Sequence, residues 1–104
     1  MKNLHIIFFY LISHFSFGQI VINELDSDTN STDVLEFLEL KSAVPNFSLT
    51  GYCIVFFNGT SSGNGNLSYY AVDLDGFATD ANGIFLIGNP LVSPTPQISI
   101  PITT

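Results

Sequence analysis

The densest group of oxygen-bearing side chains lies in the segment 26–33, with the sequence DSDTNSTD. A calcium ion takes about six to eight oxygen ligands from carboxylates, amides, carbonyls and water. The candidate ligands in this segment are Asp26, Asp28, Asn30 and Asp33. The spacing D-x-D-x-N opens like an EF-hand loop, but Ser31 stands in place of the turn glycine and Phe37 in place of the bidentate glutamate. The alternative is a solvated turn, because Asp, Asn and Ser favour loop backbone.

A second, weaker candidate for the same cation lies around Gly76. It consists of the carboxylates of Asp73, Asp75 and Asp80. Turn chemistry again explains these residue types without a metal, so the expected cofactor is none, with calcium as the alternative.

Three glutamates offer the carboxylate pair that glycoside hydrolysis requires. They are Glu24, Glu36 and Glu39. Nothing in their spacing selects that reaction, and acids on strands commonly form a solvent-facing ladder or contact a partner. We therefore expect no enzymatic activity and no catalytic residue, and keep a carboxylate hydrolase as the alternative.

Cys53 is the one cysteine of the chain, so no internal disulfide can form. A nucleophilic cysteine needs a base or a positive neighbour. Cys53 instead lies within the apolar run Tyr52–Phe57, which predicts a core residue.

The first eighteen residues, Met1–Gly18, have the three parts of a secretory signal peptide. Lys2 supplies the basic start, Ile6–Ile12 the apolar stretch, and Ser16 to Gly18 the small residues before a cut. A transmembrane anchor needs about 20 apolar residues, and polar side chains interrupt this stretch too early. The sequence predicts a secreted or periplasmic protein that begins at Gln19 and does not insert in a membrane.

The remaining domain, residues 19–104, is strongly acidic. It carries one lysine against nine acids, for a formal charge of −8, and both histidines leave with the signal. Phosphate neutralisation needs clustered Lys and Arg, so nucleic acid is excluded as a partner. A protein or cell-surface partner with a basic face fits this charge.

Short apolar or alternating runs separated by Asn-Gly and proline turn signals predict an all-β domain, a sandwich or barrel. The runs are Ile20–Leu25, Leu35–Leu40, Leu49–Phe57, Leu67–Leu74, Ile84–Ile87 and Gln97–Ile102. Tyr52–Phe57 is apolar on both strand faces, which suits an inner strand covered on both sides. Periodicity alone leaves Thr32–Leu40 open between helix and strand.

Four of these pieces, read in order, resemble the lamin-tail domain of secreted bacterial proteins. They are VINEL at 21–25, EFLEL at 36–40, LTGYCIV at 49–55 and GIFLIG at 83–88. The resemblance implies an immunoglobulin-like β-sandwich, with Thr32–Leu40 as strand, that serves as a non-catalytic binding or adhesion module. A calcium-stabilised adhesion domain is the alternative. Family members usually continue past the position of Thr104 with closing strands. We therefore expect a truncated copy whose unpaired strand edge can self-associate.

Overall fold

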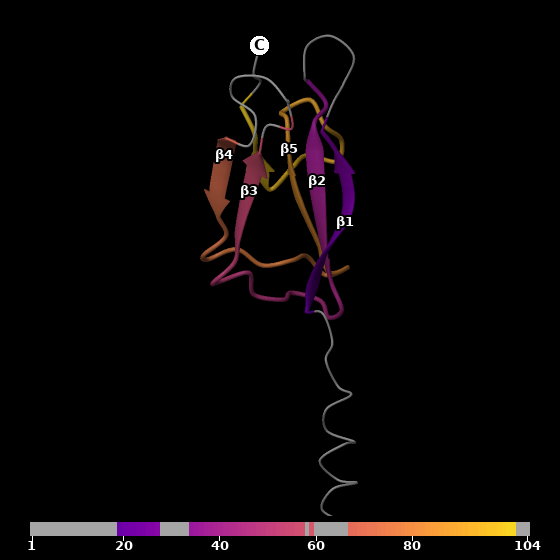
Figure 1. Ribbon diagram of the computed structural model, residues 1–104. Coiled ribbons are helices and arrows are strands. Elements are labelled where there is room, and N and C mark those ends of the chain that lie inside the picture. Colours follow the sequence, from indigo (N-terminus) through magenta and orange to yellow (C-terminus); the bar gives the residue numbers. More distant parts are fainter. Residues whose placement is uncertain (1–18, 28–33, 58, 60–66, 102–104) are drawn as a thin grey trace, which may run out of the picture.

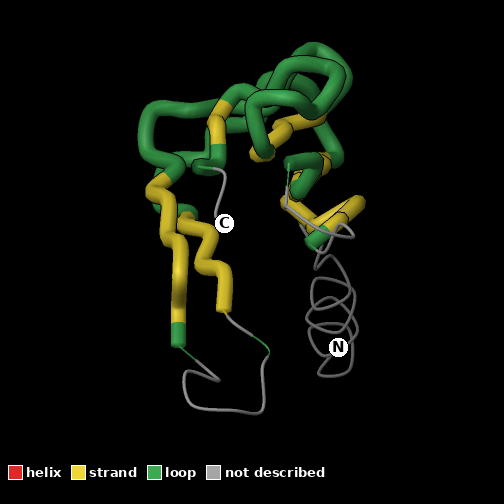
Figure 2. Tube along the Cα trace, turned by 90° about the horizontal axis from the view of Figure 1, so that it is seen from above, coloured by secondary structure: helices red, strands yellow, loops and turns green. Residues whose placement is uncertain are grey.

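A computed structural model describes residues 19–27, 34–57, 59 and 67–101, and it contains strands and loops without a helix in these ranges (Figure 2). The strands are β1 (Ile20–Asp26), β2 (Phe37–Ser42), β3 (Cys53–Phe57), β4 (Ser68–Asp73), β5 (Ile84–Gly88) and β6 (Ile98–Ser99). The predicted all-β class is thus confirmed. The segment Met1–Gly18 and the candidate ligands Asp28, Asn30 and Asp33 lie outside the described residues.

The strands form two sheets (Figure 1). The larger sheet has the order β1-β2-β5-β6, and the smaller one pairs β3 with β4. The β1–β2, β2–β5 and β3–β4 pairs are antiparallel, whereas β6 runs parallel to β5. The short β6 ends two residues before Pro101, which agrees with the expected limit that a proline sets on a strand.

The hydrophobic core lies between the two sheets. On the larger sheet, Leu38 stands opposite Ile87 and Leu40 opposite Phe85, so these four side chains share one face. Phe56 of β3 joins the same buried cluster from the smaller sheet. The full cluster comprises Leu38, Leu40, Leu49, Phe56, Leu74, Phe85, Ile87 and Ile100. We call the face of the larger sheet that meets this core its inner face, and the opposite one its outer face.

The segment 32–40, which periodicity left open between helix and strand, contains the start of β2. Leu38 and Leu40 are buried while Phe37 and Glu39 are only partly buried, which is the period of two that a strand produces. The prediction of a strand is confirmed for this part of the segment.

The prediction that Tyr52–Phe57 forms an inner strand covered on both sides is wrong. Strand β3 belongs to a two-stranded sheet, and one of its faces is open to solvent. Val55 is 41% exposed and Phe57 63% exposed, whereas Phe56 between them is buried. The run is apolar on both faces, but the fold covers only one of them.

A buried polar cluster holds the far end of β2 against two loops. The Ser42 hydroxyl lies 2.9 Å from the Thr79 hydroxyl and donates to the Val44 carbonyl at 2.6 Å. The Ser42 amide donates to the Gly83 carbonyl at 2.8 Å, and the Phe47 amide donates to the Thr79 hydroxyl at 2.9 Å. Buried polar groups that are all paired in this way specify one arrangement of the loops.

Asn89 joins the ends of three strands at the opposite end of the larger sheet. Its side chain is fully buried. The carboxamide oxygen accepts from the Glu36 amide at 2.6 Å, and the carboxamide nitrogen donates to the Ile100 carbonyl at 3.4 Å. Its own amide donates to the Glu36 carbonyl at 2.8 Å. Asn89 therefore fixes the residue before β2 and the residue after β6 to the end of β5.

Candidate functional site

An apolar groove opens between β1 and β3, beside the core. It has a volume of about 110 Å³ and an almost wholly apolar lining. The lining residues are Ile20, Val21, Ile22, Leu40, Leu49, Tyr52, Ile54 and Leu74. They come from both sheets and from the loops between them, so the groove exists only when the two sheets are assembled.

Strand β1 borders this groove and is one of the two edge strands of the larger sheet. It pairs with β2 on one side, and no strand among the described residues pairs with its other side. The register sets Ile22 beside Leu40 and Leu25 beside Leu38, which places both side chains on the inner face. Ile22 is nevertheless 59% exposed and Leu25 54% exposed. Two apolar side chains on the inner face of β1 are thus left open to solvent by the described residues.

The outer face of the larger sheet has a hollow of its own. It also measures about 110 Å³ and is lined by Glu24, Phe37, Glu39, Leu86, Val92, Ser93 and Pro94. Glu24 and Glu39 are direct cross-strand partners, so the predicted ladder of acids is present for this pair. The Asn23 carboxamide donates to Glu39 at 2.7 Å. An apolar floor with two carboxylates at one side suits a lysine or arginine, whose aliphatic stem packs while its charge meets an acid.

Glu36 does not join the other two glutamates. It is 3% exposed, and its carboxylate accepts a hydrogen bond from the Tyr69 hydroxyl at 2.9 Å. The sequence offered the three acids as candidates for a carboxylate pair or a solvent-facing ladder, and it did not predict this burial. The signal was present, because Glu36, Leu38 and Leu40 follow the period of two that marks the inner face.

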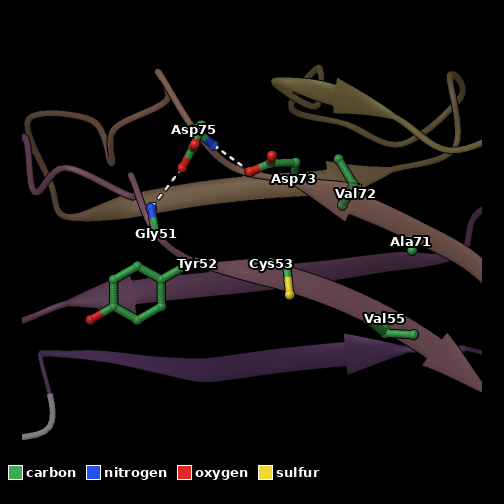
Figure 3. A pocket seen from close by; sticks show the side chains of 8 residues that line it. All are labelled: Gly51, Tyr52, Cys53, Val55, Ala71, Val72, Asp73 and Asp75. Carbon is green, nitrogen blue, oxygen red and sulfur yellow. Dashed lines mark hydrogen bonds between the residues drawn. The ribbon is translucent and has the colours of Figure 1, made fainter.

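A depression of about 450 Å³ lies over the smaller sheet (Figure 3). It includes Cys53, which is exposed, so the prediction of a core cysteine is wrong. Cys53 and Val55 are on the outer face of β3, which no second layer among the described residues covers. The carboxylates at the rim already bind backbone: Asp75 accepts from the Gly51 amide at 2.7 Å, and Asp73 from the Asp75 amide at 2.9 Å.

The acids around Gly76 therefore serve the turns. Asp80 follows the same rule, since its carboxylate accepts from the amides of Asn82 and Ile84 at 2.8 and 2.9 Å. Of the four candidate calcium ligands in 26–33, the structure describes Asp26, whose side chain is exposed at the end of β1. Within the described ranges, no three His, Cys, Asp or Glu side chains gather closely enough to share a metal ion.

No family model, curated protein or solved structure matches this chain. The ranges that the structure describes also hold no helix with the length and hydrophobicity to cross a membrane.

Proposed function

We propose that this chain is an exported, non-catalytic binding module that recognises a protein partner at the edge strand β1. Its two sheets with a shared core support an immunoglobulin-like sandwich of the lamin-tail kind, together with the four sequence pieces that resemble that family. The signal-like segment Met1–Gly18 supports a secreted or periplasmic location.

One observation carries the proposal: the inner face of β1 is apolar, and the described residues leave it open to solvent at Ile22 and Leu25. Ile22 and Leu25 are each more than half exposed, and Ile22 lines a groove that is itself apolar. Contiguous exposed apolar surface with a polar surround marks interaction sites. Full burial of an exposed side chain of this type releases about 1.5–3 kcal/mol, so a partner segment that covers the remaining exposed half gains about 0.8–1.5 kcal/mol for each.

The acids support binding rather than catalysis. Glu24 and Glu39 face the outer side of the sheet, whereas Glu36 is buried against Tyr69, so Glu36 does not form a pair with either across one cleft. The hollow beside Glu24 and Glu39 measures about 110 Å³, well below the roughly 300 Å³ at which ligand pockets begin. A polysaccharide substrate would have no enclosed site there.

The charge narrows the class of partner. From Gln19 onward the sequence has nine acids and Lys41 as its one cation. Nucleic acid and anionic membrane surfaces repel such a chain, while a basic protein surface attracts it.

A peptide-display selection tests this function. The protein is purified in the form that the cell produces, immobilised, and exposed to a random library of linear peptides. The affinity of the enriched peptides is then measured for the parent protein and for its variants. Ile22→Asp places a charge on the apolar face of β1, and we expect it to weaken the enriched peptides by about tenfold or more. Leu91→Asp is the matched control, because Leu91 is 64% exposed against 59% for Ile22 but does not line the groove. It should leave binding unchanged.

Circular dichroism melts of both variants should overlay that of the parent protein, since both positions are on the surface. A selection that enriches no peptide would refute the proposed function. Enriched peptides that bind Ile22→Asp as tightly as the parent would refute it equally.

A further inference from the structure

The geometry points to the chemistry of the partner: we infer that β1 accepts an extended peptide segment in which apolar and basic residues alternate, added to the sheet as a further strand. This inference rests on the proposed function and deepens it. It follows from three properties of β1: a backbone edge that no strand among the described residues pairs with, an apolar inner side and an acidic outer side.

The backbone provides the first property. In an antiparallel pair, alternate residues direct their amide and carbonyl groups to the partner, and the others direct theirs away. β1 runs for seven residues and pairs with β2 on one side, so some of its polar groups point away from the sheet. An extended peptide about 4.8 Å away satisfies these groups by adding a strand.

The inner side selects apolar residues. Side chains of an added strand alternate between the two faces of the sheet, so every second one lies next to Ile22 or Leu25. These two side chains are more than half exposed, and the groove beyond Ile22 reaches Tyr52 and Ile54 near β3. An aliphatic side chain there extends the buried cluster, whereas a charged one would lose its hydration without a partner.

The outer side selects basic residues. The remaining side chains of the added strand lie on the face that carries Glu24 and Asp26, with Glu39 on the next strand. A lysine or arginine opposite Glu24 can direct its charge to that carboxylate and toward Glu39 on β2. Lys41, the cation on the same face, lies at the other end of the strand pair, opposite Val21.

A second copy of this chain fits the same edge poorly. An incoming β1 would bring its own Glu24 and Asp26 to a face that is already acidic, and like charges on adjacent strands are destabilising. These acids favour a different, basic chain.

Synthetic peptides test this chemistry directly. The chain contains no tryptophan, so one tryptophan in a peptide gives a fluorescence signal that belongs to the peptide alone. Three ten-residue peptides are compared: alternating isoleucine and lysine, alternating isoleucine and glutamate, and the first composition with its isoleucines and lysines in separate blocks. We expect the alternating basic peptide to bind at least about tenfold more tightly than either of the others.

Protein variants assign the two sides. The isosteric pair Glu24→Gln and Glu39→Gln should together weaken the basic peptide by about five- to tenfold and flatten its salt dependence. Ile22→Asp should also weaken binding of the basic peptide, because it places a charge on the apolar inner face. The control is the pair Asp73→Asn and Asp75→Asn, which removes the same amount of charge at the smaller sheet. It should leave the affinity for the basic peptide unchanged, provided that thermal melts show a folded domain.

Each adverse result has a distinct meaning. Equal binding of the acidic peptide, lost in Ile22→Asp, would overturn the basic pattern while leaving the proposed function intact. Equal binding of the block peptide would overturn strand addition in favour of diffuse charge attraction. Sedimentation that shows a dimer abolished by Ile22→Asp, with no peptide bound, would overturn the inference in favour of a second copy. A display selection that enriches no peptide would instead refute the proposed function itself.

Discussion

Replacing Gly83 by alanine is expected to lower the free energy of unfolding by about 3 kcal/mol. Gly83 has a φ of 77°, a conformation that costs an alanine about 1–2 kcal/mol. The added Cβ would also lie 2.7 Å from the Ser42 carbonyl oxygen and 3.1 Å from its hydroxyl. That carbonyl oxygen belongs to the backbone at the end of β2 and cannot move without disturbing the bonds between Ser42, Thr79 and Gly83.

The matched control is Gly76→Ala. Gly76 has nearly the same φ, 83°, but no neighbouring atom lies within 4 Å of the position that an alanine Cβ would occupy. This variant should lose about 1–2 kcal/mol, the cost of the backbone conformation alone. Urea unfolding followed by circular dichroism measures both. Equal losses in the two variants would show that the 78–83 loop does not pack against the end of β2 as described.

Replacing Asn89 by alanine is expected to destabilise the domain by a similar amount, about 3 kcal/mol. The side chain is fully buried and bonds the Glu36 amide at 2.6 Å and the Ile100 carbonyl at 3.4 Å. Its removal leaves a buried amide without a partner, which costs about 1–3 kcal/mol, and opens a small cavity. The same urea series measures the loss.

Asn23→Ala serves as the control for this second variant. The Asn23 carboxamide also donates a short hydrogen bond, to Glu39 at 2.7 Å, but at an exposed site. Water replaces that partner, so the expected loss is about 0.5 kcal/mol or less. If Asn89→Ala proved as mild as Asn23→Ala, Asn89 would not join β2, β5 and β6.

Much of the fold could be predicted from the sequence because strand periodicity is local. Each of the six apolar or alternating runs overlaps one of the strands, and the alternation of Leu38 and Leu40 gives the inner face of β2 directly. Whether one or both faces of a strand are covered depends on the rest of the fold and cannot be predicted from the strand's own sequence. Tyr52–Phe57 reads as a doubly buried strand, yet it lies in a sheet of two strands and exposes Cys53 and Val55.

The candidate site was harder to predict for the same reason. Residue types drew attention to the carboxylates, but Asp75 and Asp80 bond turn amides, a role that depends on loop conformation. The groove brings Ile20, Tyr52 and Leu74 together across more than fifty residues of sequence. Which apolar side chains remain uncovered depends on register and sheet assembly, and neither is visible in a single run.

Amide hydrogen exchange, resolved by residue, is the sharpest test of recognition at the β1 edge. The protein is compared with and without the alternating isoleucine–lysine peptide at saturating concentration. We expect slower exchange at the amides of Ile20–Asp26 that face away from β2, because the added strand bonds them. Little change should occur across Cys53–Phe57. Unchanged exchange in β1, with protection over the smaller sheet instead, would contradict recognition at this edge.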